Sequence, residues 1–239
     1  VQVLVVDDGS TDGTCRVMAE LQDRYRARFQ DDRVHYVYQN RHGAGAARNC
    51  GLSLATGTFV AFLDSDDVWL PGKLRTELAL FEKYPHVDAV ISDSGFWSEG
   101  KLVAGSRFEL FGVHLPPGTP FLTELAPRWI EKSLFSTCCL TLRRSALARI
   151  GPFDTVLRSH EDWDFELRMY HTCQVVIHPE VTARVRRFDD GTRSERGTDR
   201  EHLWVQYRIL ERTRRLPPLS PPPASRSCSR HSASSRGRL

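Results

Sequence analysis

Apolar and polar positions follow one another along the chain in blocks that predict a succession of strands and helices. Residues 1–6 form a continuous, mostly β-branched run, which is typical of a strand buried on both faces. Apolar residues then recur at helical spacing over residues 12–28. Three further elements follow: a strand at 34–39, a helix at 44–55 and a strand at 58–63. This order predicts an α/β fold whose strands pair in parallel through right-handed crossovers.

The second half of the chain has the same kinds of pattern, interrupted by one irregular stretch at residues 93–135. Helices are expected at 71–84, 145–150, 162–170 and 201–211, and strands at 87–92, 138–143, 175–177 and 181–185. Residues 212–239 are rich in Arg, Pro and Ser and poor in apolar residues, so we expect them to be disordered. The sequence thus predicts one domain over 1–211 followed by a tail over 212–239.

The charge distribution separates the expected tail from the rest of the chain. The formal net charge is +3, but residues 212–239 hold seven Arg and no acid. The other 211 residues therefore carry 26 basic and 30 acidic side chains, which disfavours a nucleic-acid-binding body.

Apolar runs are far too short to cross a bilayer. The six cysteines include no CxxC pair, so free thiols and a cytoplasmic location are expected.

Two clusters of carboxylates directly follow predicted strands. Asp7 and Asp8 end the first strand, and Asp64, Asp66 and Asp67 end the strand at 58–63. The carboxyl ends of strands are where ligands bind in open parallel sheets. Crowded carboxylates repel one another, and Mg²⁺ or Mn²⁺ binds to one or two carboxylates together with phosphate oxygens. Both clusters also allow another interpretation: a turn with a helix cap for the first, and a solvated acidic loop for the second.

A third acidic cluster lies in R-S-H-E-D-W-D-F-E-L-R-M at residues 158–169. Acids near a helix N-terminus are favoured by the helix dipole, so some of them are expected to be structural. Asp164 and Arg168 have the spacing of an i,i+4 ion pair. Glu161 and Asp162 lie where the loop meets the helix, and a base there could point into a cleft. His160-Glu161 does not continue as HExxH, which excludes a zinc protease of that type.

Taken together, these segments resemble the inverting family-2 glycosyltransferases of the GT-A fold. The resemblance covers residues 1 to about 195 and rests on four motifs in the family's order. They are D-D-G-S-T-D-G-T at 7–14, A-R-N-C-G-L-S-L-A-T-G at 47–57, F-L-D-S-D-D-V-W-L-P at 62–71, and I-G-P-F-D at 150–154 followed by E-D-W-D-F-E-L-R at 161–168. The resemblance implies a Rossmann-like, mostly parallel sheet flanked by helices. The family's usual first strand and helix have no counterpart in this chain.

The resemblance also implies roles for residues that would bind the donor. Asp7 and Asp8 correspond to acids on the nucleotide side, one of which would accept a hydrogen bond from the base. Asp64-Ser65-Asp66 resembles the D-x-D motif, with Asp64 near the ribose and Asp66 as ligand of Mg²⁺ or Mn²⁺ on the diphosphate. Arg48 fits a loop on the donor side, and a structural salt bridge is the alternative use of its guanidinium.

On the acceptor side, Asp162 corresponds to the general base. It would deprotonate an acceptor hydroxyl, which then displaces the nucleotide with inversion. The partners implied are a nucleotide-sugar, most simply a UDP-sugar, and a carbohydrate, lipid-linked or protein acceptor. Such chemistry serves cell-envelope polysaccharide or glycoconjugate synthesis, in the cytoplasm or peripherally at the inner face of the membrane.

The chain departs from the family pattern in a late loop, and rival interpretations remain. The family often has a His there, where this chain has Phe188 in R-R-F-D-D-G-T-R-S, and Arg186, Arg187 and Arg193 are alternative partners for the diphosphate. A degenerate, non-catalytic transferase is one rival. A response-regulator receiver domain is another, because V-L-V-V-D-D resembles its first strand. Against the receiver, Asp8 and Asp64 are 56 positions apart, and residues 150–168 are left unexplained.

Overall fold

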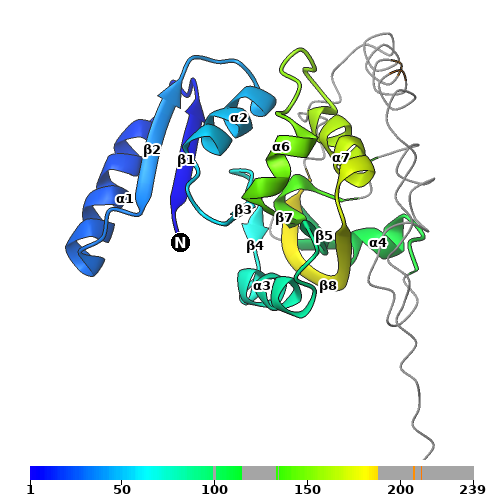
Figure 1. Cartoon of the computed structure of the whole chain (residues 1–239). Coiled ribbons are helices and arrows are strands. Elements are labelled where there is room, and N and C mark those ends of the chain that lie inside the picture. The colour runs from blue at the N-terminus through cyan, green and yellow to red at the C-terminus, as the bar shows by residue number, and fades with distance from the viewer. Residues whose placement is uncertain (99–100, 115–132, 134, 188–206, 208–210, 212–239) are drawn as a thin grey trace, which may run out of the picture.

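The computed structural model describes residues 1–98, 101–114, 133, 135–187, 207 and 211. Within them the chain forms an α/β fold with two separate sheets (Figure 1). The first sheet, with the helices that follow its strands, is called the N-terminal unit here and spans residues 3–54. The second is called the main sheet, and its strands lie between residues 59 and 186.

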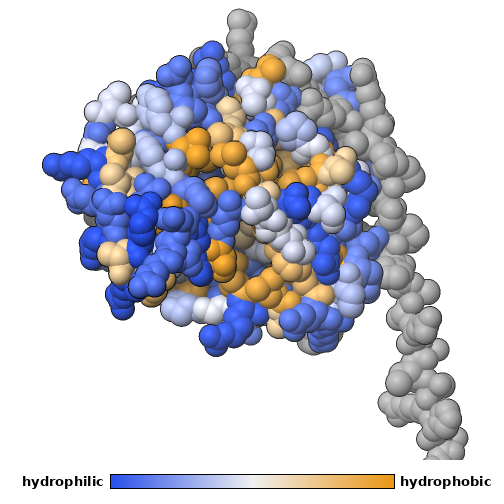
Figure 2. Space-filling model, turned by 60° about the vertical axis from the view of Figure 1, so that its left-hand side comes forward, coloured by the Kyte–Doolittle hydropathy of each residue, from blue (hydrophilic) through white to orange (hydrophobic). Residues whose placement is uncertain are grey.

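The N-terminal unit is a β-α-β-α segment whose two strands pair in parallel. Strand β1 (Val3–Asp8) pairs in register with β2 (Val34–Gln39), and helix α1 (Thr14–Phe29) connects them. Helix α2 (Ala44–Leu54) follows β2 and contacts β1. Only Asp7, Met18 and Gly45 of residues 1–54 are buried. Apolar side chains accordingly reach the surface among hydrophilic ones on this side of the molecule (Figure 2).

The main sheet has six strands, five of them in the order β3-β7-β5-β8-β4. In that order they span Phe59–Ala61, Leu140–Arg143, Ala89–Ser98, Val175–Arg186 and Val68–Trp69; the sixth, β6 (Lys101–Ala104), pairs with β5. The long ladder between β5 and β8 is parallel, and the other pairings of this sheet are antiparallel. The two parallel ladders, β1 with β2 and β5 with β8, are the longest in the described structure.

Helices cover the main sheet and bring distant segments together. They are α3 (Lys73–Lys83), α4 (Arg107–Leu110), α6 (Leu147–Ile150) and α7 (Glu161–Thr172), with short 3-10 turns at Thr137–Cys139 and Arg144–Ala146. At the centre of the core, the rings of Phe153 and Phe165 stack at 4.2 Å, and Phe62 meets Phe153 edge-on at 5.7 Å. This aromatic cluster fixes the start of α7 beside the segment that follows β3. No helix among the described residues is long and apolar enough to span a bilayer.

The structure agrees with most of the expected elements and differs at three of them. Helices α1, α2, α3 and α7 and strand β2 lie where the periodicity predicts them. Strand β3, however, does not pair with β1 or β2; it pairs antiparallel with β7. Strand β5 runs on to Ser98, into the stretch expected to be irregular. The two strands expected at 175–185 form one strand, β8, whose register shifts opposite Ser92–Ser94.

Two expectations concern segments that the structure does not describe in full. The helix expected at 201–211 lies outside the described residues except at Tyr207 and Glu211, and the predicted tail over 212–239 lies outside them entirely. The division at residue 211 therefore stays a prediction. The five described cysteines are free thiols, as expected; Cys138 and Cys139 are buried and Cys15 is exposed.

Candidate functional site

The two acids at the end of β1 are both held by hydrogen bonds from uncharged groups. The side chain of Asp7 accepts the Tyr36 hydroxyl on Oδ2 at 2.6 Å and the Ser10 backbone N–H on Oδ1 at 2.8 Å. The Tyr36 hydrogen bond is the main reason why the pKa of Asp7 lies below its usual range. Asp7 is therefore ionised, has no cationic partner among the described residues, and lies at the carboxyl end of β1, as the sequence predicts.

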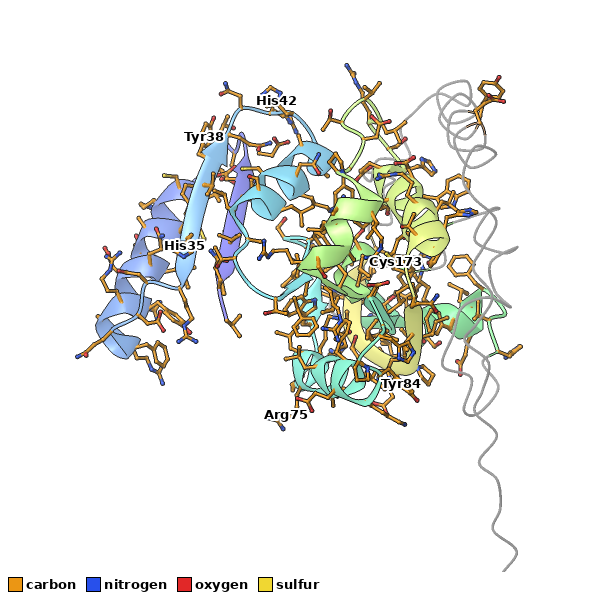
Figure 3. The ribbon with its side chains drawn as sticks, in the orientation of Figure 1. His35, Tyr38, His42, Arg75, Tyr84 and Cys173 are labelled. Atoms are coloured by element: carbon orange, nitrogen blue, oxygen red, sulfur yellow. The ribbon has the colours of Figure 1, made fainter. Side chains whose placement is uncertain are left out.

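Asp8 fixes the loop between β2 and α2. Its Oδ1 accepts Gln39 Nε2 at 2.7 Å and the His42 backbone N–H at 2.8 Å, and its Oδ2 accepts the Gly43 backbone N–H at 2.7 Å. Burial pushes the pKa of Asp8 upward, but these hydrogen bonds outweigh it and leave the pKa below its ordinary value. Figure 3 shows His42 with Tyr38 at this end of β2. The side chain of Asp8 thus determines where α2 begins.

Arg48 on α2 connects the second and third acidic clusters. Its Nη1 donates to Glu161 Oε1 at 2.7 Å, and its Nη2 donates to Asp64 Oδ1 at 3.0 Å and Oδ2 at 3.2 Å. The guanidinium also lies over the Phe153 ring, 5.4 Å from its centroid. The Arg48 side chain is 13% exposed, and burial alone would lower its pKa; Asp64 and Glu161 reverse that and raise the pKa above its ordinary value. The salt bridge named as an alternative for Arg48 is therefore formed.

The next residue on α2 strengthens this connection. Asn49 Nδ2 donates to the Phe153 carbonyl at 2.9 Å, and Asn49 Oδ1 accepts the Phe153 backbone N–H at 2.8 Å. One amide thus satisfies both backbone groups of a residue in the I-G-P-F-D motif. Gly45 lies on the same helix, where a Cβ would be 3.4 Å from the Glu161 side chain. Helix α2 therefore packs closely against the start of α7.

The loop after β3 presents three carboxylates in different environments. The Asp64 side chain is 41% exposed although it pairs with Arg48, and Asp66 is partly exposed. Asp67 is buried, and its Oδ1 accepts the Arg186 backbone N–H at 3.0 Å. Burial raises the pKa of Asp67 to about 6. Asp67 thus anchors the loop to β8, and Asp64 and Asp66 remain accessible to a ligand.

This loop fits the kind of metal site that the family implies. Among the described residues, no three His, Cys, Asp or Glu side chains converge as a ready-made metal cage. Mg²⁺ and Mn²⁺ sites that act on diphosphates do not need such a cage, because one or two carboxylates suffice when phosphate oxygens and water supply the other ligands. Two neighbouring, partly exposed carboxylates, Asp64 and Asp66, match that requirement.

The acids at the start of α7 divide into paired, buried and accessible groups. Glu161 pairs with Arg48, and Asp164 pairs with Arg168 at 2.7 Å, as the i,i+4 spacing predicts. Glu166 is 1% exposed. Asp162 is partly exposed, and its Oδ1 accepts the Trp163 backbone N–H at 2.8 Å. Within the described residues Asp162 forms no salt bridge, so its carboxylate is the one in this group that an incoming ligand can reach without breaking an ion pair.

The site therefore joins residues that are far apart in the sequence. Arg48 spans the distance between Asp64 and Glu161, and Glu161 directly precedes Asp162. Asp7 and Asp8 lie on the adjacent N-terminal unit. The positive charge of Arg107 interacts with Glu166 and Asp162. The sequence does not single out this residue, because Arg107 lies in the stretch where the pattern predicts no element. Phe188 and Arg193 lie outside the described residues.

Comparisons with known proteins point to one family. A family model described as Glycosyl transferase family 2 matches residues 1–151. The chain is 34% identical over 118 residues to the Escherichia coli UDP-Glc:alpha-D-GlcNAc-diphosphoundecaprenol beta-1,3-glucosyltransferase WfaP, covering 49% of this chain and 40% of that protein. Across the curated relatives that it matches first, the chain spans 24% to 54% of their length.

Solved structures show the same fold. The chain of S. aureus TarS in complex with UDP-GlcNAc matches with a TM-score of 0.66 and 22% identity, over 89% of this chain and 57% of that chain. The mannosyltransferase PcManGT from Pyrobaculum calidifontis, in complex with GDP-Man and Mn2+, matches with a TM-score of 0.60 and 21% identity, over 92% and 57% of the two chains. These likenesses confirm the predicted GT-A fold, and the family match favours a transferase over a receiver domain.

Proposed function

This chain belongs to glycosyl transferase family 2, and we propose that it transfers a sugar from a UDP-sugar to an acceptor hydroxyl with inversion at the anomeric carbon. The observation that carries the proposal is the bridge of Arg48 between Asp64 and Glu161. This bridge holds Asp64, on the side where the donor would bind, close to Glu161 at the start of α7. The acceptor would bind beside the acids of α7, so one arginine side chain joins the two sides.

On the donor side, the proposal gives Asp64 and Asp66 the diphosphate end of the nucleotide. Asp66 would hold Mg²⁺ or Mn²⁺, with Asp64 toward the ribose. The bound ion would supply positive charge against the diphosphate, so that the nucleotide leaves as a stabilised anion. Asp7 would accept a hydrogen bond from the base, because its carboxylate lies at the carboxyl end of β1 and is stabilised in its charged form by Tyr36 and Ser10. Asp8, which accepts three hydrogen bonds, would position the loop between β2 and α2. Arg48 would orient Asp64.

On the acceptor side, the proposal gives Asp162 the role of general base. Its carboxylate is partly exposed at the N-terminus of α7, whereas Glu161 and Asp164 are held by arginines. A base of this kind removes the proton from the acceptor hydroxyl as the oxygen attacks the anomeric carbon, and such a group typically contributes about 10²–10⁴-fold. The name of the E. coli relative suggests a lipid-linked sugar as the acceptor class. Such an acceptor would place the protein peripherally at a membrane.

Thermal unfolding of the full chain with UDP and Mn²⁺ tests the donor side. A ligand that binds only the folded state raises the melting temperature, and saturation at about 100 times Kd corresponds to about 2.7 kcal/mol. We expect UDP with Mn²⁺ to stabilise the protein and Asp66→Ala to abolish that gain. Asp23→Ala, at an exposed acid on α1, is the matched control and should keep it. An equal gain in Asp66→Ala would contradict the assignment of Asp66.

Release of UDP from UDP-sugars tests the chemistry. We expect Asp162→Asn to bind UDP with Mn²⁺ as the wild type does and to lose at least about 10²-fold in turnover. The anomeric configuration of the product, followed by NMR, tests inversion. A protein that binds UDP but releases none from any UDP-sugar would be a non-catalytic member of the family. Turnover in Asp162→Asn equal to the wild type would refute the base.

A further inference from the structure

Beneath Asp162, helix α7 carries a buried acid that the proposed chemistry does not use. Asp162, Glu166 and Tyr170 are spaced i, i+4 and i+8, so they follow one another along one side of the helix. Asp162 is partly exposed, whereas Glu166 is 1% exposed and Tyr170 is also buried. A carboxyl group buried this deeply needs either a cation or a proton.

The hydrogen bonds of Ser133 show how the proton on Glu166 is placed. Ser133 Oγ lies 2.9 Å from Glu166 Oε1 and also 2.9 Å from the backbone carbonyl of Phe135. A hydroxyl has one hydrogen, and a carbonyl can only accept. If Ser133 donates to Phe135, then the hydrogen in the contact with Glu166 must come from Glu166. A protonated Glu166 therefore satisfies both contacts at once, and an ionised Glu166 would leave one of them without a hydrogen.

Arg107 provides the positive charge in this region. Its guanidinium lies over the rings of Phe96 at 5.4 Å and Phe111 at 5.0 Å, and Nη2 donates to the Ser133 carbonyl at 3.2 Å. Arginine remains charged in proteins, even when buried. Both Glu166 and Asp162 attract this charge. Arg187 lies over the same Phe96 ring at 4.0 Å and repels Arg107, but Arg107 is the cation that acts on Glu166. Glu166 and Asp162 therefore share the charge of Arg107, and a neutral Glu166 leaves that charge to Asp162.

We propose that Glu166 is a positioning residue for Asp162: it is a neutral carboxylic acid that donates its proton to Ser133 Oγ and so leaves the charge of Arg107 to Asp162. The assignment of Asp162 as the partner in need of that charge rests on the proposed function. A negative Glu166 one turn away would instead repel the Asp162 carboxylate and compete for Arg107.

The electrostatics of the surrounding groups agree with this arrangement. Burial raises the pKa of Glu166 well above its ordinary value and the charge of Asp162 raises it further; a hydrogen bond donated by Ser133 and the charge of Arg107 would lower it, but burial outweighs both. Tyr170, on the next turn of α7, is buried with its own pKa raised well above the ordinary value. Asp162 is in addition subject to the charges of Arg48 and Glu161, which largely pair with each other.

The protonation of Glu166 can be measured without any activity. Infrared spectra of protein labelled with ¹³C at the glutamate carboxyl groups should show a C=O band of a protonated acid at neutral pH. We expect this band to disappear in Glu166→Gln and to remain in Glu180→Gln, the control at an exposed acid. If the band is absent from the wild type, or is unchanged in Glu166→Gln, then Glu166 is ionised and the proposal is wrong.

The effect on Asp162 is measured by following its ¹³C carboxyl signal during a pH titration. Glu166→Gln keeps a neutral side chain that can donate to Ser133, so the Asp162 titration midpoint should stay where it is in the wild type. Arg107→Gln removes the charge and should move the midpoint upward, whereas Arg107→Lys should not. A downward shift in Glu166→Gln would show that Glu166 carries a negative charge, and no shift in Arg107→Gln would show that Arg107 does not serve Asp162.

Both measurements report on the folded protein alone, so they separate this proposal from the proposed function. If the band and the titrations follow expectation but Asp162→Asn keeps full turnover, then the arrangement around Glu166 stands and Asp162 is not the base. If Arg107→Gln does not fold, the infrared band and the Glu166→Gln titration still decide the outcome.

Discussion

The two acids at the end of β1 and the acids that pair with cations in the main sheet and α7 are stabilised in different ways. In the N-terminal unit, hydroxyl, amide and backbone N–H groups donate to Asp7 and Asp8 and hold the pKa of each carboxyl below its ordinary value. In the main sheet and α7, Glu77 pairs with Lys73, Asp164 pairs with Arg168, and we propose that Glu166 is neutral. Asp67 and Asp93, which are also buried there, accept hydrogen bonds from hydroxyl and backbone N–H groups, as Asp7 does. The neutral donors leave the charge of Asp7 and Asp8 for a ligand to use, whereas the ion pairs neutralise the charge of Glu77 and Asp164.

Burial explains this difference. The deeper a carboxylate lies, the more it depends on several neutral donors, a countercharge or a proton to replace the water that it loses. Only three of residues 1–54 are buried, whereas β5 is buried along nearly its whole length. Arg48 connects the two regions, because it belongs to the N-terminal unit and pairs with Glu161 on α7. Substitutions in each region therefore test the comparison.

The largest effect is expected at the buried pair beneath the main sheet. Glu77 accepts Lys73 Nζ and Ser92 Oγ on one oxygen and Thr141 Oγ1 on the other at 2.6 Å, and both charged residues are almost fully buried. Glu77→Ala leaves Lys73 buried without its countercharge and should cost about 3–5 kcal/mol in urea unfolding. Glu20→Ala, at an exposed position of α1, should cost less than about 0.5 kcal/mol. Equal losses in the two variants would remove the contrast between the regions.

The next effect is expected where the two regions meet. Arg48→Met removes the bridge and leaves the half-buried Glu161 without its partner, which should cost about 2–3 kcal/mol after allowance for the exposure of Asp64. It should also reduce UDP release, because Asp64 would no longer be oriented. Arg26 is a matched control, since it too bridges two acids, Asp23 and Asp32, but is 57% exposed.

Arg26→Ala should therefore cost less than about 1 kcal/mol and leave UDP release unchanged. If Arg48→Met were no more harmful than Arg26→Ala in unfolding and in turnover, the bridge would not hold the site together.

The sequence predicts the elements that depend on local pattern. Helical periodicity locates α1, α3 and α7, and the first two acidic clusters lie at or just after the ends of strands, β1 and β3. These predictions succeed because the helical repeat and the position of an acid after a strand are properties of short segments. The i,i+4 pair of Asp164 with Arg168 succeeds for the same reason.

The sequence does not predict contacts that depend on how segments pack. Arg48 and Glu161 are 113 positions apart, and no local pattern couples them. The antiparallel pairing of β3 with β7 likewise follows from the whole sheet and not from the strand-helix-strand order that precedes it. Arg107 and Ser133 belong to a stretch with no periodicity, so the sequence pattern does not predict their contacts around Glu166.

The smallest effect is expected at Tyr36, in the N-terminal unit. Its hydroxyl holds the pKa of Asp7 below the ordinary value, so this interaction stabilises the fold above the unfolded pKa of Asp7 and is lost as the pH falls through the folded one. Tyr36→Phe should therefore be less stable than the wild type at neutral pH, by less than Arg48→Met, and the difference should close in acid, below about pH 4. Melting temperatures across pH 3 to 7 measure this. Tyr25→Phe, which leaves Asp7 untouched, is the control. A difference that persists unchanged at pH 3 would mean that Tyr36 acts through packing, and that Asp7 needs more than a neutral donor to stay ionised.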